Sequence, residues 1–325
     1  MSRAWGPWTA VKLDALGRYL SAFTSASQRA RATLYLDLFS GVADNLERDS
    51  GRRLLGSPSR ALATQPAFDK LLFCELQPRS ALALDAQLRQ RYPDRDFQVL
   101  PGDCNVEIPQ ALAALPDGWR WAPIFAFLDQ YSAEIRWSTL ETLATYKVHR
   151  KPKIEQWLFF GDGLLPRGLH PDPNGEPSEP YASRVDGMFG TKQWREIWLG
   201  RYTGLLTPLE SRQQLVNLMR WRLETVLGYK ATLPLAVTND RGVPVYTMIF
   251  ATDHPVGEKI MTSVLGVAER ALQEMRDGAK ARRARESEEA RGLLALFATD
   301  VLSDAPQPAR SSIDPPEEPW RHPDL

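Results

Sequence analysis

Cysteine and histidine are scarce in this sequence, with two cysteines and four histidines among 325 residues. The two thiols, Cys74 and Cys104, and the scattered histidines show no metal-ligand spacing, and they imply no disulfide framework. An excess of charge of one sign is also lacking, since 40 Lys and Arg balance 40 Asp and Glu. The chain therefore has no overall basic field of the kind that indicates nucleic-acid binding, although a local basic patch is compatible with zero net charge.

Long hydrophobic runs are absent as well. No apolar run approaches the length of a membrane span, and the first residues lack the apolar segment of a signal peptide. The content of 43% hydrophobic and 25% charged residues is ordinary for a globular chain. We therefore expect no membrane association and a cytoplasmic protein of the size of an enzyme.

Short apolar runs alternate with segments of helical periodicity through the first half of the chain. Because strands that alternate with helices form parallel sheets, this pattern predicts an α/β fold. A further pair of runs, 231–237 and 245–250, is joined by a turn at 239–242 and predicts a hairpin. The five strands predicted before that pair cover 33–39, 70–74, 97–100, 123–128 and 154–160.

The composition divides the chain into segments. Residues 161–190 hold several Gly and Pro with little periodicity and predict a loop, while 191–227 has a helical, aromatic-rich pattern. After residue 300 the chain is rich in Pro, Ser and acids, which is typical of disorder. The predicted segments are an N-terminal helix in 1–29, a cofactor-binding α/β core in 30–160, a loop and helical insertion in 161–229, the terminal strands and helix of the core in 230–275, a charged helix in 276–299 and a disordered tail in 300–325.

The stretch 33–41 is the most informative in the chain. It has the composition of a buried parallel strand. An acid, Asp37, lies toward the end of this apolar run, and a glycine, Gly41, follows the run. Glycine lets the backbone turn sharply and lets a ligand approach, and the amides that follow can donate hydrogen bonds to it. Since open α/β sheets bind ligands at the carboxyl ends of their strands, we predict a nucleotide-like cofactor at Gly41. A tight turn without a ligand is the alternative.

Acids also follow the second and third predicted strands. Glu75 stands where α/β nucleotide-binding proteins bind a ribose diol, and Asp103 could accept a hydrogen bond from the exocyclic amine of an adenine ring. A surface carboxylate and a helix N-cap are the respective alternatives. The residues predicted to bind the cofactor are Asp37, Phe39, Gly41, Glu75, Asp103 and Cys104.

The loop after the fourth strand predicts a catalytic pair. Asp129 would orient an amine nucleophile, and Tyr131 would stack on a flat substrate. Ordinary loop polarity is the alternative. We also predict substrate contacts in a basic segment, 147–153, because its side chains could neutralise phosphates; a solvated loop is the alternative. The predicted substrate-binding residues are Gln130, Ser132, Lys147, Arg150 and Lys151.

Acids after four successive strands are the layout of the class I S-adenosylmethionine-dependent methyltransferase sheet. A dinucleotide-binding Rossmann domain is less consistent with the sequence, since no Gly-x-Gly-x-x-Gly follows the first strand. A P-loop is excluded by the lack of its Gly-Lys-Ser/Thr element. We predict a Rossmann-like class I methyltransferase fold, with a mainly parallel sheet, a C-terminal antiparallel hairpin, a helical insertion and S-adenosylmethionine as cofactor.

Several short motifs occur in order between residues 8 and 265. They include aromatic, glycine and acidic positions at the ends of predicted strands and at the starts of predicted helices. The motifs are Trp8-Thr9 with Lys12, Tyr35-Leu36-Asp37-Leu38-Phe39-Ser40-Gly41, Gly56-Ser57-Pro58 with Ala61-Leu62, Phe127-Leu128-Asp129, Trp194-Arg195, and Tyr246-Thr247-Met248-Ile249-Phe250-Ala251-Thr252 with His254, Gly257 and Met261.

This set resembles the three-Cys-motif partner (TcmP) family of methyltransferase-like proteins. The resemblance implies a Rossmann-like methyltransferase fold and a partner protein that carries a three-cysteine motif. The sequence departs from the family at Val42-Ala43, where the family tends to have Pro-Gly, and at Gln130, where it tends to have Pro. These departures make a catalytically inactive scaffold the first alternative.

The functional prediction is a methyltransferase that acts on a base amine of nucleic acid together with a three-Cys-motif protein. The second alternative is a metal-dependent nucleic-acid-processing enzyme on the same sheet. That alternative requires the carboxylates of Asp37, Asp103 and Asp129 to converge, and the prediction otherwise assigns no metal ligands.

Overall fold

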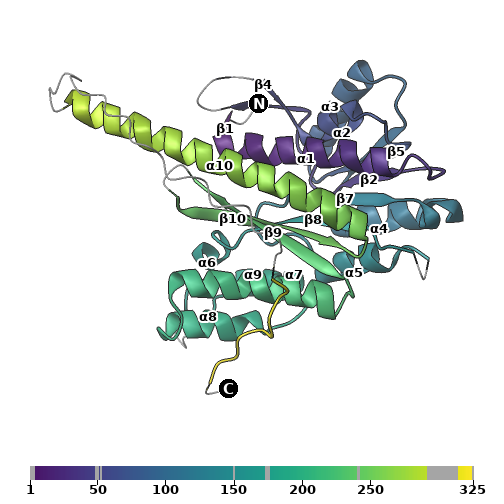
Figure 1. Cartoon of the computed structure of the whole chain (residues 1–325). Helices are drawn as coiled ribbons and strands as arrows, with labels where there is room; N and C mark the ends of the chain where they lie inside the picture. The colour runs from purple at the N-terminus through teal and green to yellow at the C-terminus, as the bar shows by residue number, and fades with distance from the viewer. Residues whose placement is uncertain are drawn as a thin grey trace.

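A seven-stranded sheet forms the centre of the molecule, with the strand order β6-β5-β2-β7-β8-β10-β9 (Figure 1). The computed structural model describes residues 4–47, 51, 53–148, 151–172, 176–239, 242–290 and 314–323. The five strands from β6 to β8 are parallel, and β10 is antiparallel to both of its neighbours. The predicted α/β class is thus confirmed. The strands are β2 (Leu34–Asp37), β5 (Lys70–Glu75), β6 (Phe97–Pro101), β7 (Ile124–Leu128), β8 (Glu155–Phe160), β9 (Ala231–Thr238) and β10 (Pro244–Thr252).

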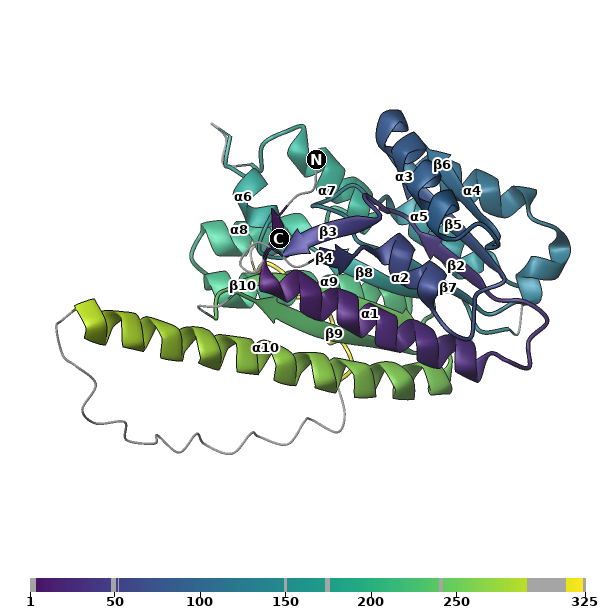
Figure 2. The ribbon, with the colours of Figure 1, turned by 90° about the horizontal axis from the view of Figure 1, so that it is seen from above.

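Helices cover both faces of this sheet, which explains why its central strands are apolar without alternation. Every residue of β2 and of β7 is buried. On one face α1 and α10 lie side by side across the sheet (Figures 1 and 2). This face packs against α1 (Pro7–Ala26), α2 (Ser57–Ala63), α3 (Pro78–Arg91) and α10 (Pro255–Ala290), and the other against α4 (Cys104–Ala114), α5 (Trp137–Thr145), α7 (Tyr181–Phe189), α8 (Trp194–Tyr202) and α9 (Pro208–Thr225).

A second, smaller sheet was not predicted. Its order is β1-β3-β4, with β1 (Ala4–Trp5), β3 (Asp44–Glu47) and β4 (Arg53–Leu55). The sequence analysis predicts no strand between 33–39 and 70–74. The strands are only two to four residues long, so they are too short to show a hydrophobic period from which a strand could be recognised.

The helical insertion between β8 and β9 differs from its prediction in detail. The expected loop at 161–190 contains α6 (Leu165–Gly168) and α7, and the expected helix at 191–227 is divided into α8 and α9. The division has a local cause, because Thr207 caps α9 in a capping box with Glu210 and Pro208 follows the cap.

Before β7, residues 117–121 form a short 3-10 helix, η1 (Asp117–Trp121).

The end of the chain is more ordered than its composition predicted. The charged segment continues α10 to Ala290. Residues 314–323 of the predicted disordered tail are described, and they pack against α8 and α9; the rest of 300–325 and residues 291–299 lie outside the described residues. Trp320 explains the difference, since a composition average hides one large apolar anchor. Within the described part of the chain, no helix is both long and apolar enough to cross a bilayer.

Candidate functional site

The parallel strands place four of the predicted acids at one edge of the sheet. Asp37 ends β2, Glu75 ends β5, and Asp103 and Asp129 follow β6 and β7. The chain adds β5 and β6 on one side of β2, and then adds β7 and β8 on the other side. The strand order therefore reverses between β2 and β7, and open α/β sheets bind ligands in the crevice outside such a reversal.

Asp37 lies at this reversal, but its carboxylate is turned into the core. Its side chain is fully buried, the Tyr35 hydroxyl donates to Oδ2 at 3.2 Å, and the Phe39 amide donates to Oδ1 at 3.3 Å. Burial raises the pKa of Asp37 to about 7, although a hydrogen bond from Ser57 opposes this shift. The carboxylate thus shapes the turn that carries Phe39 and is not offered to a ligand.

Gly41 and Glu75 are joined directly. The Gly41 amide donates to Glu75 Oε2 at 3.1 Å, and the Gln77 amide donates to Oε1 at 3.0 Å. Gly41 has a φ of +62°, and a Cβ built on it would meet no atom within 4 Å. The loop after the central strand is therefore held against the acid of the neighbouring strand, with open space beside it.

Asp103 acts as the N-cap of α4. Its Oδ1 accepts from the Asn105 amide at 2.9 Å and from Asn105 Nδ2 at 2.8 Å. This is the alternative that the sequence had left open. Cys104 follows in the first turn and is 5% exposed, and burial raises the pKa of its thiol well above the usual range. The structure therefore places this thiol in the core.

Asp129 binds Lys12, which the sequence analysis placed in a motif but did not predict to be a site residue. Lys12 of α1 places Nζ 2.6 Å from Oδ1 and 2.5 Å from Oδ2 of Asp129. The Lys12 side chain is 8% exposed and that of Asp129 24%. The ammonium also lies over the rings of Phe159 and Tyr246, at 5.8 and 5.6 Å from their centroids. The ion pair of Lys12 and Asp129, with two aromatic rings next to it, therefore forms the inner side of the site.

The loop after Asp129 has one inward and one outward side chain. Gln130 is 2% exposed; its Nε2 donates to the Phe159 carbonyl at 3.0 Å, and its Oε1 accepts from the amides of Glu134 and Ile135. The side chain therefore holds the loop together, and its predicted contact with a substrate stays a prediction. Tyr131 is 75% exposed.

A cavity of about 360 Å³ opens beside this loop. Tyr131 and Ser132 line it from the loop, and Tyr181 and Arg184 line it from α7. Ser132 Oγ and the Tyr181 hydroxyl share a hydrogen bond of 2.5 Å, which joins the two sides. The insertion thus contributes a phenol and a guanidinium to the site.

The described residues of the predicted basic segment, 147–148 and 151–153, lie at the other edge of the sheet. The segment leads into the first residue of β8, and the Lys151 ammonium lies 5.3 Å from the ring centroid of Trp121, which precedes β7. The five residues of β7, about 17 Å of strand, separate that edge from Asp129. Lys147 and Lys151 are therefore not brought to the site, and Arg150 lies outside the described residues. Burial lowers the pKa of Lys147 to about 8.

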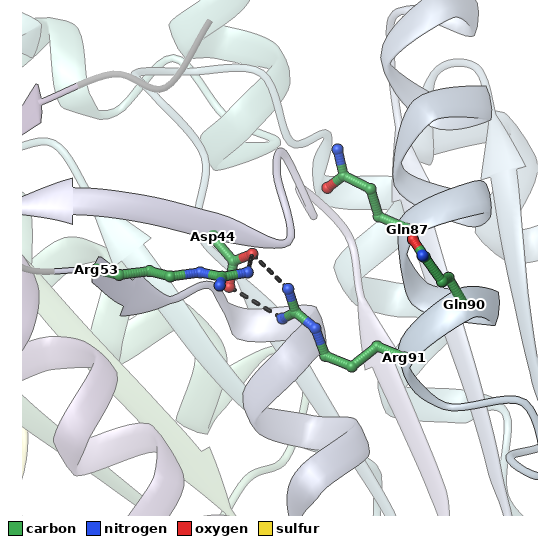
Figure 3. Close-up of a pocket in the computed structure, with 5 residues that line it drawn as sticks. All are labelled: Asp44, Arg53, Gln87, Gln90 and Arg91. Atoms are coloured by element: carbon green, nitrogen blue, oxygen red, sulfur yellow. Dashed lines mark hydrogen bonds and ion pairs between the residues drawn. The ribbon is translucent and has the colours of Figure 1, made fainter.

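A second cavity, of about 470 Å³, lies between the small sheet and α3 (Figure 3). Arg53 of β4 and Arg91 of α3 both bind the carboxylate of Asp44, Arg91 with N–O distances of 2.7 and 3.0 Å. The hydrogen bond from Arg91 is the main reason why the pKa of Asp44 is lowered. Since one carboxylate binds both guanidinium groups and joins β4 to α3, we interpret the cluster as a brace between sheet and helix.

Several residues of the site could not be recognised from the sequence pattern, but Lys12 could have been. It falls on the apolar stripe of α1 that continues through Leu16, Tyr19 and Phe23, where a charge is unexpected without a partner. Tyr181 and Arg184 lie in the segment predicted as a loop, so no pattern pointed to them. No group of three or more His, Cys, Asp or Glu among the described residues is arranged to hold a metal ion.

Comparison with known proteins adds little to this geometry. No protein-family model matches the chain, and no curated protein matches it. Among solved structures, the chain is similar to protein LPL1258 from Legionella pneumophila, described by the family model DUF519, with 12% identity, 82% of this chain and 93% of that chain covered, and a TM-score of 0.45. At this level the likeness carries no argument. The resemblance to the TcmP family gains no support here and stays a prediction.

Proposed function

We propose that this chain is an S-adenosylmethionine-dependent methyltransferase whose cofactor lies at the carboxyl ends of β2 and β5. The observation that carries the proposal is the reversal of the strand order between β2 and β7. The loop with Gly41 lies on one side of this reversal, and Asp129 lies on the other. Cofactor and acceptor amine would thus meet where the two strands diverge.

The far end of the sheet supports the finer fold prediction. In a class I methyltransferase sheet the last two strands form a reversed hairpin, as the sequence analysis expected. Here β10 lies antiparallel between β8 and β9, and the helical insertion precedes both strands of the hairpin. This arrangement favours the methyltransferase fold over a doubly wound dinucleotide-binding sheet, and it is compatible with the resemblance to the TcmP family.

The residues at the reversal fit the cofactor. The open space at Gly41 admits a ligand close to the backbone, and the Glu75 carboxylate is half-buried and has lone pairs beyond the two that the Gly41 and Gln77 amides use. Such a carboxylate can accept hydrogen bonds from both hydroxyls of a ribose. Ala43 is 1% exposed in the core and Val42 is 41% exposed on the surface, which favours an open loop over the scaffold alternative.

The residues on the other side fit an amine acceptor. S-adenosylmethionine, when bound, supplies an electrophilic methyl group. Lys12 occupies one lone pair on each oxygen of Asp129 and holds the carboxylate in place. The remaining lone pairs can accept hydrogen bonds from an amine, and Tyr131 offers an exposed ring on which a flat substrate can stack. We infer a base amine of nucleic acid as the acceptor.

The cation nearest to that acceptor is not one of those that the sequence suggested. Arg184 lines the cavity beside Tyr131 and can pair with a phosphate, whereas Lys147 and Lys151 lie at the far edge. The metal-dependent alternative fits less well, because Asp37 is buried and Asp103 caps a helix. A three-Cys-motif partner remains part of the proposal through the family resemblance alone.

Transfer of a tritiated methyl group from S-adenosylmethionine to RNA and DNA tests the proposal. We expect acid-precipitable label on one of the two nucleic acids with the wild-type chain and at least about tenfold less with Asp129→Asn. Arg212→Gln, at an ion pair with Asp162 outside the cavity, serves as the control for a lost charge pair. If the cofactor binds but neither nucleic acid is labelled, the scaffold alternative is correct.

A further inference from the structure

The described C-terminal segment, 314–323, lies along α8 and α9 without forming a helix or a strand (Figure 1). Four of its ten residues are prolines. Proline restricts φ before as well as after binding, so that ordering such a segment costs less conformational entropy than ordering an average one. A short extended peptide of this composition is suited to docking on a preformed surface.

The helices contact the backbone of this segment. Asn217 of α9 donates from Nδ2 to the Glu317 carbonyl at 3.0 Å and accepts from the Glu317 amide at 3.0 Å. The side-chain amide of Asn217 thus forms the two backbone hydrogen bonds that a neighbouring strand would form with an extended chain. Arg220, one turn further along α9, donates to the Asp314 carbonyl at 2.7 Å. These contacts recognise an extended peptide whatever its side chains are.

Side-chain contacts add specificity at the other end of the segment. The Trp320 ring lies on Gly200 of α8, where an added Cβ would overlap it. Arg321 forms an ion pair with Glu196 at 2.8 Å, and the second oxygen of Glu196 accepts from the His322 amide at 3.2 Å. The large apolar side chain of the segment therefore contacts a glycine of α8, and the cation that follows it pairs with an acid of the same helix.

The two helices have their own attachment to the body. Trp194 and Ile197 of α8 and Leu215 and Leu218 of α9 are buried in the apolar cluster on this side of the sheet. The segment lies on the outer side of helices that are already packed. We propose that α8 and α9 form a docking surface for an extended Pro-Trp-Arg peptide, and that residues 314–323 cover this surface as an intramolecular ligand that dissociates without unfolding of the helices.

Fluorescence anisotropy with a labelled synthetic peptide of residues 314–325 tests this proposal. The receptor is the full chain carrying Trp320→Ala, whose own segment has lost its anchor. We expect this receptor to bind the peptide at least about tenfold more tightly than the wild-type chain does, because the docking surface of the wild-type chain is occupied by its own segment. The proposal is overturned if the two chains bind the peptide alike, or if a peptide with Trp320→Ala binds as well as the native peptide.

A receptor with both Trp320→Ala and Gly200→Ala is the matched control. Alanine favours a helix more than glycine does, so Gly200→Ala blocks the contact with the Trp320 ring without weakening α8 by propensity. We expect this receptor to lose peptide binding by at least about tenfold. Unchanged binding by the double variant would place the peptide elsewhere and contradict the proposal.

Hydrogen exchange on the wild-type chain gives a second test that needs no variant. The amides of Glu317 and His322 donate to Asn217 and Glu196, so we expect them to be protected relative to a free peptide. Their exchange should nevertheless be faster than that of the α9 amides, because the segment opens alone. Exchange at the free-peptide rate, or in step with α9, would overturn the proposal.

Discussion

Lys12 and Asp129 are separated by 117 residues, yet the Lys12 ammonium lies within 2.6 Å of both carboxylate oxygens. The pair connects the N-terminal helix to the loop that follows β7. Only 8% of the Lys12 side chain is exposed, so the charge is largely removed from water and depends on its partner. The pair therefore contributes to the stability of α1 and to the geometry of the candidate site.

The first prediction concerns this pair. Lys12→Met leaves the Asp129 carboxylate without its counter-ion, and we expect a loss of about 2–3 kcal/mol in the free energy of unfolding. The variant with both Lys12→Met and Asp129→Asn should lose less than the sum of the single variants, by about 1 kcal/mol or more. Urea denaturation of the four chains measures this coupling. Additive losses would show that the two side chains do not interact.

The second prediction concerns Glu155, which lies away from the site at the start of β8. It is 5% exposed, and its carboxylate accepts from the Tyr19 hydroxyl at 2.6 Å and from Thr252 Oγ1 at 2.8 Å. Burial raises the pKa of Glu155 to about 7 from 4.5. Between these values the folded chain keeps a proton that the unfolded chain releases, so stability is lost as the pH rises through this window.

Asp37 gives the chain the same pH dependence, since its pKa is also raised to about 7 and the folded chain loses stability as the pH rises toward that value. We expect the free energy of unfolding of the wild-type chain to fall between pH 5 and pH 7, with each of the two groups contributing up to about 1.4 kcal/mol per pH unit. Glu155→Gln should remove one of the two contributions. Urea denaturation at pH 5, 6, 7 and 8 measures the slope, and identical slopes for both chains would contradict the assignment.

The third prediction concerns Tyr131. Since 75% of its surface is exposed, Tyr131→Ala should change the free energy of unfolding by less than about 0.5 kcal/mol. We expect the rate of methyl transfer to fall by at least about tenfold, because the acceptor loses its stacking surface. Tyr202→Ala, at an exposed tyrosine of α8, should leave the rate unchanged. Equal rates for all three chains would remove Tyr131 from the site.

The fourth prediction compares two glycines. Gly41 and Gly204 have φ values of +62° and +83°, and a Cβ on either would meet no atom within 4 Å. Replacement of either by Ala should therefore cost about 1–2 kcal/mol through backbone conformation alone. Only Gly41→Ala should also weaken S-adenosylmethionine binding, because its methyl group enters the proposed cofactor site. If both variants bind the cofactor as the wild-type chain does, the site lies elsewhere.

The parts of the fold that sequence could predict are those with a strong hydrophobic period. Buried runs such as 123–128 and 154–160 identified the strands. The small sheet could not be found in this way, because Asp44 and Arg53 belong to strands of four and three residues, which are too short to show a hydrophobic period. Tertiary contacts, and not local pattern, form such strands.

The ends of the strands could be predicted from the sequence, but the orientations of the side chains there could not. The strand ends placed Asp37, Glu75 and Asp129 at one edge, but no pattern shows that Asp37 faces inward to Tyr35. The basic segment was misplaced for a similar reason. Residues close to Asp129 in sequence lie at the opposite edge once α5 has crossed the sheet.

The most direct test of the proposed function is calorimetric titration of the wild-type chain with S-adenosylmethionine. The open loop at Gly41 and the carboxylate of Glu75 predict binding of one molecule per chain with a Kd below about 100 μM. Gly204→Ala should bind the cofactor equally well, and Gly41→Ala should bind it more weakly. Absence of binding heat up to about 1 mM cofactor would contradict the account.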